Sequence, residues 1–196
     1  MQAVESQTLI LYHTDLQDDW PEEGGRALAA TLPYLRRLAV SSGSADARAS
    51  LAGIALALRA LKDSLGRVVA ASEIVFAPDE KPRLGGDDGA DFSIAHTGAL
   101  VGCAALAGAR VGFDVEQGTD EHLNNWVARE ATVKAAGFGM RALNEVTLVH
   151  RGALCRGVRW YALNLDSFPG ATACVMSSIE LTDARVRALT LAELFP

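Results

Sequence analysis

The sequence predicts an α+β protein with a pseudo-twofold duplication, in which each copy is a helix plus an antiparallel three-stranded meander and the site lies between the halves. The chain has 196 residues and 49 % apolar composition, which suffices for a substantial core. A helix, a strand and a meander follow one another in both halves. Residues 96–106, HTGALVGCAAL, also resemble residues 168–178, FPGATACVMSS. We therefore expect residues 1–118 and 119–196 to be two pseudo-repeats within one compact unit.

The first elements are predicted to be a strand and two short helical pieces. Apolar and β-branched residues recur at 8–14, which is typical of a strand. A proline opens a helix at residues 21–30, and two glutamates in its first turn suit the positive end of the helix dipole. A second proline redirects the chain into residues 34–38. Arg36 and Arg37 in this piece indicate a solvated face.

The longest helix is predicted at residues 45–65. Serine residues directly before it can cap its N-terminus, and Gly66 is a stop signal at its C-terminus. A short strand at residues 73–78 follows. The glycine-rich residues 85–89 then indicate an exposed loop.

The remaining elements are predicted from short β-rich runs between glycine turns. The first meander comprises strands at residues 92–97, 100–106 and 110–116. The second half is predicted to repeat this arrangement, with a helix at 120–136, strands at 145–149, 157–164 and 171–178, and a last strand with a short tail at 186–195.

Charge and composition exclude several functions. The net charge is −6, which argues against a nucleic-acid partner because phosphate backbones demand a basic surface. The N-terminal residues lack the pattern of an export signal, and the apolar stretch at residues 51–61 is too short to span a bilayer. We therefore expect a cytoplasmic protein without a membrane segment. The three cysteines have no metal-binding spacing, so we expect buried, reduced thiols.

The acidic residues of the predicted strand VGFDVE carry the main chemical signal. Asp114 and Glu116 are two positions apart and so point to one face of the strand. On the following helix, Glu130 and Lys134 are four positions apart and share one face. Clustered carboxylates are typical ligands of Mg²⁺, which would assist a reaction of phosphates. The alternative is a solvated strand edge with an ordinary ion pair on the helix surface.

Three motifs in order, FSIAHT, VGFDVE and WVAREATVKAAGFG, resemble those of the 4′-phosphopantetheinyl transferases of the Sfp type. The resemblance covers nearly the whole chain. It implies transfer of the phosphopantetheine arm of coenzyme A to a serine of an acyl or peptidyl carrier protein in fatty-acid, polyketide or peptide synthesis. Asp114, Glu116 and Glu130 match the magnesium ligands of that family. Glu130 would also be the general base, and Lys134 would lie near the coenzyme phosphates.

The resemblance also implies which residues bind the coenzyme. Arg48 matches an arginine that meets the 3′-phosphate, and Lys81 matches a lysine that contacts the nucleotide. His96 matches a histidine that meets a phosphate. The alternatives from the residues alone are an ordinary surface charge for Arg48 and a structural hydrogen bond for His96. For Arg36 and Arg37, a contact with the coenzyme is the alternative to a solvated face.

Two departures from the family pattern keep other functions open. Arg129 replaces the usual lysine of the helix motif, and only residues 117–125 separate Glu116 from Trp126, where the family has a longer segment implicated in docking the carrier protein. A catalytically weak or inactive relative that binds coenzyme A or a carrier protein is one alternative. A magnesium-dependent phosphohydrolase is a second, and a structural interaction protein is a third. We expect a monomer, because a duplicated chain can form a whole site.

Overall fold

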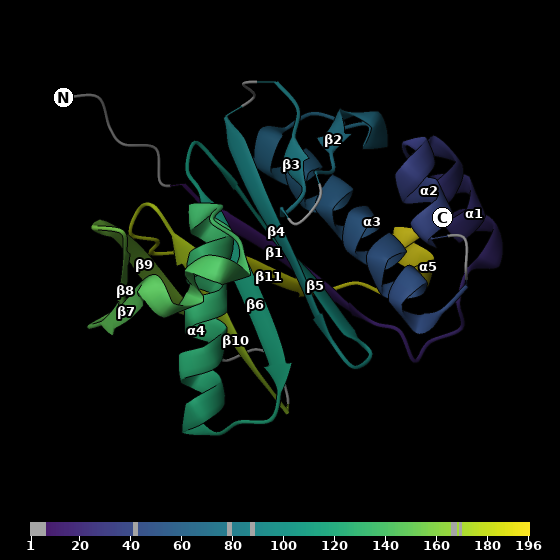
Figure 1. Ribbon diagram of the computed structural model, residues 1–196. Helices are drawn as coiled ribbons and strands as arrows, with labels where there is room; N and C mark the ends of the chain where they lie inside the picture. Colours follow the sequence, from purple (N-terminus) through teal and green to yellow (C-terminus); the bar gives the residue numbers. More distant parts are fainter. Residues whose placement is uncertain (1–6, 41–42, 78–79, 87–88, 166–167, 169) are drawn as a thin grey trace.

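The structure is a computed structural model, and it describes residues 7–40, 43–77, 80–86, 89–165, 168 and 170–196 (Figure 1). It contains helices and two main sheets that are largely antiparallel, which confirms the α+β class. The predicted strand end at residue 78 and residues 87–88 of the predicted loop lie outside the described residues. The elements in chain order are β1 (Leu9–Asp15), α1 (Glu22–Thr31), α2 (Tyr34–Val40), α3 (Ala45–Leu65), η1 (Ala71–Glu73), β2 (Ile74–Val75), β3 (Arg83–Leu84), β4 (Ala90–Thr97), β5 (Leu100–Ala107), β6 (Val111–Gln117), α4 (Glu121–Ala136), η2 (Met140–Glu145), β7 (Val146–Val149), β8 (Gly152–Cys155), β9 (Val158–Asn164), β10 (Ala171–Ser177), β11 (Ala184–Ala188) and α5 (Leu191–Leu194).

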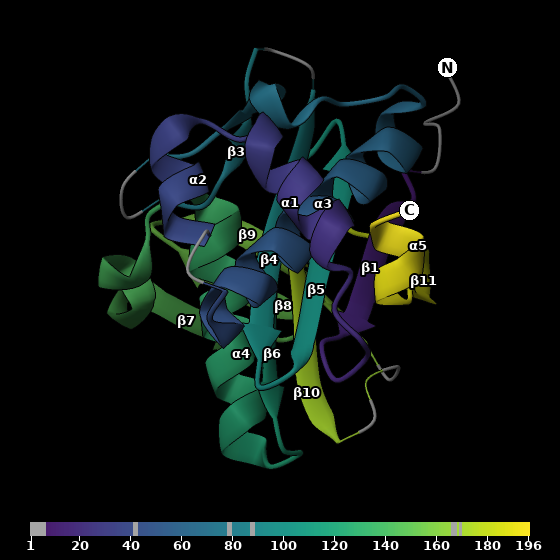
Figure 2. The same cartoon turned by 90° about the vertical axis from the view of Figure 1, so that its right-hand side faces the viewer.

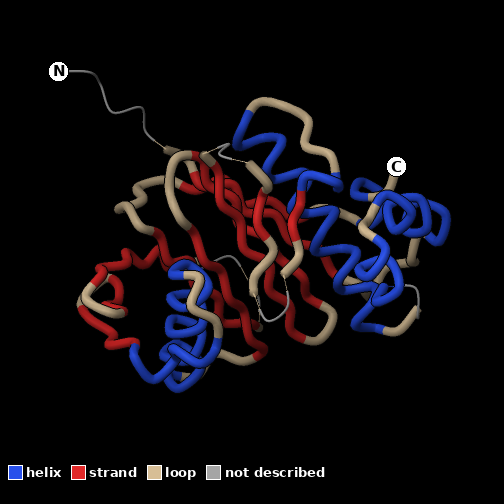
Figure 3. The backbone as a smooth tube through the Cα atoms, turned by 45° about the horizontal axis from the view of Figure 1, so that its top comes forward, coloured by secondary structure: helices blue, strands red, loops and turns tan. Residues whose placement is uncertain are grey.

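The molecule has four layers, with two sheets inside and helices outside (Figures 1 and 3). The first sheet has the strand order β11-β1-β5-β4, and the second has the order β6-β10-β9-β8-β7. The helix α3 covers the outer face of the first sheet, with α1 and α2 beyond it (Figure 2). The helix α4 covers the second sheet on the opposite side.

Alternating strand residues explain how these layers hold together, because successive side chains point to opposite faces. Along β1, Ile10 and Tyr12 pack with α3, whereas Leu11 packs against the second sheet. Along β6, Phe113 and Val115 face the same inter-sheet core. The other face of β6 therefore turns toward α4, and this is the face that carries its acidic residues.

The pairing of β6 corrects the predicted first meander. The strands β4 and β5 form a hairpin, but β6 pairs with β10 of the second sheet and not with β5. The physical reason is burial on both faces, since Val111–Val115 are all buried between the first sheet and α4. The last strand β11 makes the reverse exchange and pairs in parallel with β1.

The two long helices begin and end close to the predicted residues. Ser44 accepts a hydrogen bond from the amide of Ala47 and caps α3, and Gly66 ends it in a left-handed conformation. Asp120 caps α4 in the same way through the amide of Leu123. Where α4 crosses β6, Gly112 lies so close to the helix backbone that a Cβ atom would overlap the carbonyl oxygen of Ala131 and the amide nitrogen of Ala135.

No described helix is long and apolar enough to cross a membrane. Each of the three cysteines, Cys103, Cys155 and Cys174, is buried with a free thiol, which confirms that expectation.

Candidate functional site

The second and third motifs meet where α4 crosses β6. Lys134 on α4 donates to Asp114 on β6, with 2.6 Å between Nζ and Oδ1. The same ammonium lies 3.7 Å from Oε2 of Glu130, one helical turn earlier. Thr97, at the end of β4 in the first motif, donates to Oε2 of Glu116 at 3.0 Å. The three motifs, distant in the sequence, therefore contribute to one cluster of polar side chains.

Asp114 is the most constrained member of this cluster. The residue is only 3 % exposed, and its Oδ2 atom has no hydrogen-bond partner among the described residues. Burial raises the pKa of Asp114 to about 6, and the charges of Glu130 and Glu116 act in the same direction, although Lys134 opposes them. A buried, ionised carboxylate with a free oxygen lowers the stability of the fold. The ion has lost its hydration, and no hydrogen bond or counter-ion replaces the water at that oxygen.

The side chains are of the types that a hard divalent cation prefers. The charges of Glu116 and Glu130 act on Asp114, and the Oδ2 atom of Asp114 has no described hydrogen-bond partner. Within the described ranges, no group of three or more His, Cys, Asp or Glu residues is arranged to hold a metal ion as the side chains stand. Lys134 instead neutralises Asp114, so a cation bound there would compete with this ammonium.

Lys81 forms an ion pair with Asp91 inside the fold. Its Nζ atom lies 2.7 Å from Oδ2 of Asp91 and 2.7 Å from the carbonyl oxygen of Val111. The side chain is 16 % exposed, and burial lowers the pKa of Lys81. Asp91 also accepts from the amide of Val111, so this pair joins the start of β4 to the start of β6. The ammonium predicted for the nucleotide thus already has two oxygen partners.

Arg48 and His96 do not join the carboxylate cluster. Arg48 turns toward α1, where it pairs with Glu22 at 3.3 Å and lies 5.6 Å from the ring centroid of Trp20. His96 precedes Thr97 on β4, so its side chain points to the opposite face of the strand, and it is exposed. The phosphate contacts implied for these two residues remain predictions.

Arg36, for which the sequence favoured a solvated face, is partly buried. One of its terminal nitrogens donates to Oγ of Ser50 at 2.8 Å, and its guanidinium lies 5.1 Å from the ring centroid of Phe76. Its Nε atom is buried without a hydrogen-bond partner among the described residues, and burial lowers the pKa of Arg36. The signal in the sequence was weak, because two adjacent arginines in a short helix usually form a solvated face.

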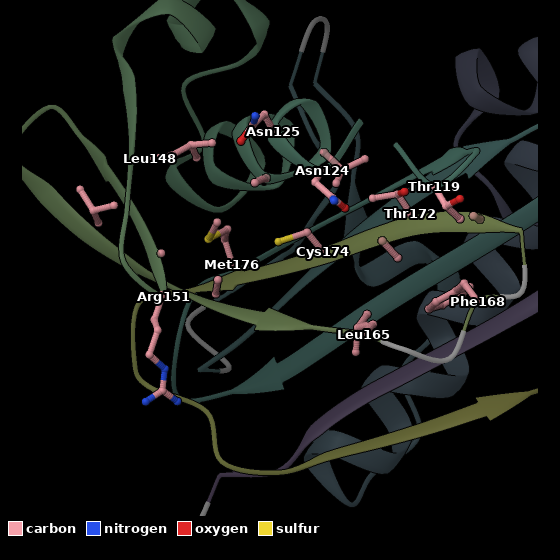
Figure 4. A pocket seen from close by; sticks show the side chains of 17 residues that line it. Thr119, Asn124, Asn125, Leu148, Arg151, Leu165, Phe168, Thr172, Cys174 and Met176 are labelled. Carbon is pink, nitrogen blue, oxygen red and sulfur yellow. The ribbon is translucent and has the colours of Figure 1, made fainter. Parts of the chain in front are cut away.

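A cavity of about 720 Å³ lies on the other flank of α4 (Figure 4). Asn124 and Asn125 of α4, together with Cys174 and Met176 of β10, are among the side chains that line it. Cys174 is opposite Asp114 in the β6–β10 ladder, so this wall of the cavity lies beside the buried carboxylate. Burial raises the pKa of the Cys174 thiol to about 12, which makes this cysteine an inert part of the wall.

The chain matches no protein-family model, and no curated protein matches it. A function is therefore inferred from the residues and their geometry.

Proposed function

We propose that this protein is a magnesium-dependent 4′-phosphopantetheinyl transferase that acts on coenzyme A and an apo-carrier protein. The observation that carries the proposal is the cluster of Asp114, Glu116, Glu130 and Lys134, in which Asp114 is buried and the others are partly buried. It contains a carboxylate oxygen without a described partner, and it is built by the motifs that resemble those of the family. A surface ion pair would not require a carboxylate that is 3 % exposed.

Four side chains of this protein would have separate roles in the transfer. Asp114, Glu116 and Glu130 would hold Mg²⁺, which supplies charge neutralisation for a pyrophosphate when bound. Glu130 is less buried than Asp114 and would accept the proton of the attacking serine hydroxyl. The serine oxygen would then form a bond to the β-phosphorus of coenzyme A while 3′,5′-ADP leaves. Lys134 lies between two of the carboxylates and would balance phosphate charge.

We further propose that the fold arose by duplication of a strand–helix–hairpin unit. In the first half, β1 precedes α3, and the sheet order is β1-β5-β4. In the second half, β6 precedes α4, and the order is β6-β10-β9. The neighbouring strands are antiparallel in both cases, which supports equivalence of the two units. The units are not the predicted three-stranded meanders, because the strand before each helix supplies the third strand.

Arg36 is a better candidate than Lys81 for binding the nucleotide end of the coenzyme. Lys81 pairs with Asp91, whereas no described carboxylate pairs with Arg36, which lies beside Ser50 and an aromatic ring. A half-buried guanidinium without a counter-ion attracts an anion. We therefore add Arg36 to His96 and Arg48 as a candidate phosphate contact.

The deciding experiment is intact-mass spectrometry of an apo-acyl carrier protein incubated with this protein, coenzyme A and Mg²⁺. We expect a mass gain of one phosphopantetheine arm. The gain should disappear with Asp114→Ala and should persist with Glu180→Ala, a matched change of an exposed carboxylate. Transfer that survives in Asp114→Ala would remove the proposed metal site from the mechanism.

A degenerate coenzyme-binding relative is the second candidate, and one observation favours it. Only residues 118–120 connect β6 to α4, which leaves no docking segment between the two motifs. This candidate predicts that calorimetry detects coenzyme A binding although no carrier gains mass. A phosphohydrolase would instead release phosphopantetheine from coenzyme A without any carrier.

A further inference from the structure

The strands β4 and β6 run side by side although they belong to different sheets (Figures 1 and 2). In the described part of the chain no backbone ladder joins them, because β4 pairs with β5 and β6 pairs with β10. Side chains of β4 bridge the two strands instead. Asp91, Ser93 and Thr97 do so from one face of β4, as the alternation of side chains along a strand predicts for odd-numbered positions.

Two of these bridges end on the backbone of β6. Oδ2 of Asp91 accepts a hydrogen bond from the amide of Val111 at 2.9 Å. Oγ of Ser93 donates to the carbonyl oxygen of Phe113 at 3.4 Å. Both hold the strands together through backbone atoms and not through a carboxylate of the candidate site.

Thr97 makes the third bridge, which ends on a carboxylate of the candidate site. Its Oγ1 atom donates to Oε2 of Glu116 at 3.0 Å. The same oxygen accepts a hydrogen bond from the amide of Gln117 at 3.3 Å. Since a hydroxyl group has a single proton, the contact with the amide uses an oxygen lone pair and leaves the proton for the carboxylate. The direction of the hydroxyl group is therefore fixed from both sides.

The turn that follows Thr97 holds this hydroxyl group in place. Thr97 pairs with Leu100 across a two-residue hairpin turn, in which Gly98 has a positive φ of 54°. Gly98 lies so close to β6 that a Cβ atom there would overlap the side-chain amide of Gln117. The β-branch of threonine also restricts its χ1 angle. Thr97 is thus a rigid donor at the end of a tight turn that packs on β6.

Glu116 depends on this contact, because the described residues offer its side chain no other hydrogen bond and no counter-ion. Asp114 lies on the same face of β6, and the two negative charges repel each other. Without a partner, the Glu116 side chain would sample several rotamers, and ordering it would cost conformational entropy. Groups that orient a metal ligand typically change metal affinity by about 10- to 100-fold when they are removed.

We propose that Thr97 is a positioning residue that orients the Glu116 carboxylate toward a bound divalent cation. This inference rests on the proposed function, and it gives the last residue of the first motif a role at the metal site. The three candidate ligands lie on β6 and α4, whereas the orienting hydroxyl group comes from the first sheet. The metal site is therefore complete only when the two sheets are packed together.

The first test measures cation binding without transfer. Mn²⁺, a paramagnetic substitute for Mg²⁺, is titrated into the full chain at saturating coenzyme A, and free Mn²⁺ is measured by electron paramagnetic resonance against a blank without protein. Thr97→Val keeps the shape of the side chain but removes the hydroxyl group, so it should weaken Mn²⁺ binding by about tenfold or more. Thr97→Ser keeps the hydroxyl group and should restore binding to within about threefold.

Ser93→Ala is the matched control for this titration. It removes another bridge between β4 and β6, one that ends on a backbone carbonyl, so it should leave Mn²⁺ binding unchanged. Equal Mn²⁺ affinity in Thr97→Val and in the unchanged protein would overturn the positioning role. An equal loss in Ser93→Ala would also overturn it, because the bridges would then act only by holding the strands together.

The second test separates cation binding from chemistry, by steady-state transfer with Mg²⁺ varied. Thr97→Val should raise the Mg²⁺ concentration at half-maximal rate by about tenfold. Its kcat at saturating Mg²⁺ should stay close to that of the unchanged protein, because excess cation fills the weakened site. A lower kcat with an unchanged Mg²⁺ requirement would mean that Thr97 does not act through the cation, and the positioning role would be wrong.

The outcomes also separate this inference from the proposed function. Mn²⁺ binding that depends on Thr97, without a mass gain on any carrier protein, would retain the positioning role and remove the transferase. Transfer with Mn²⁺ binding that is independent of Thr97 would retain the transferase and remove the positioning role. If no Mn²⁺ binds beyond the blank, the metal site itself is wrong, and both proposals are wrong with it.

Discussion

At the scale of single residues, Asp114 couples stability to pH. Its pKa is raised to about 6 by burial, whereas the unfolded chain titrates near its ordinary value of about 4. The folded state thus holds a proton that the unfolded state has lost, so the stabilisation is complete below about pH 4 and is lost as the pH rises through 6. The ionised side chain that the reaction would need is the less stable form of the folded protein.

Asp114→Asn should remove this dependence. We expect the unfolding free energy of the variant, relative to that of the unchanged protein, to increase by roughly 2 kcal/mol between pH 4 and pH 7.5. Urea denaturation at the two pH values measures it. Mg²⁺ should stabilise the unchanged protein at pH 7.5 and leave the variant unaffected, because the variant lacks the carboxylate. If the two proteins differed in unfolding free energy by the same amount at both pH values, the raised pKa of Asp114 would be contradicted.

Glu130→Gln should abolish turnover without unfolding the protein. The substitution keeps the size of the side chain but removes the proton acceptor, so we expect a loss of at least about a hundredfold in kcat. The contact with Lys134 is 3.7 Å long, and its loss should change the melting temperature little. Coenzyme binding by calorimetry provides the control. A near-normal rate would exclude Glu130 as the base.

At the scale of secondary-structure elements, the crossing of α4 over β6 is the contact that builds the site. Gly112 permits it, because any Cβ atom there would overlap the backbone at Ala131 and Ala135. The acidic residues of β6 and the helix residues Glu130 and Lys134 come together only at this separation. The site is therefore sensitive to a residue that has no functional group.

Gly112→Ala should lower the unfolding free energy by about 3 kcal/mol or more, since backbone atoms cannot move aside as a flexible side chain would. Gly157→Ala is the control, because a Cβ there meets no atom of the described residues within 4 Å and only the left-handed conformation is penalised, at about 1 kcal/mol. Chemical denaturation of both variants tests the comparison. A cost for Gly112→Ala as small as that of the control would contradict the close crossing.

The helices were predictable because their signals are local. Ser44 and Gly66 delimit α3, and Asp120 caps α4, all within a few residues of the helix ends. The hairpin strand β8 was missed because its turns carry arginines in a positive-φ conformation, Arg151 and Arg156, where asparagine or glycine is the usual signal.

The site was predictable in part for the same reason. Side chains that share a strand or helix face, such as Glu130 and Lys134, follow from spacing alone. The partners of Lys81 and Arg48 could not be predicted, because each cation pairs with a carboxylate brought near by the tertiary fold, Asp91 and Glu22 respectively. The expected phosphate roles of these two cations came from motif resemblance, which carries no information on such competing pairs.

At the scale of the whole molecule, the two halves exchange strands. The strand β6 lies in the second sheet although residues 1–118 include it, and β11 lies in the first sheet although it follows residue 119. Fragments 1–118 and 119–196 should therefore fail to fold alone. Each fragment would expose strand edges and part of the inter-sheet core. Circular dichroism during urea titration should show no cooperative transition for either fragment, and a cooperative transition in one of them would contradict this view.

The parallel pairing of β1 with β11 has a mechanical consequence. These strands lie at the two ends of the folded chain, and they run side by side in the same direction from Leu9–Ala184 to His13–Ala188. A force applied before β1 and after β11 pulls the strands past each other, so the hydrogen bonds between them are loaded together and not one after another. In an atomic force microscope, or under the pull of an unfolding motor, the molecule should yield at high force and in a single step.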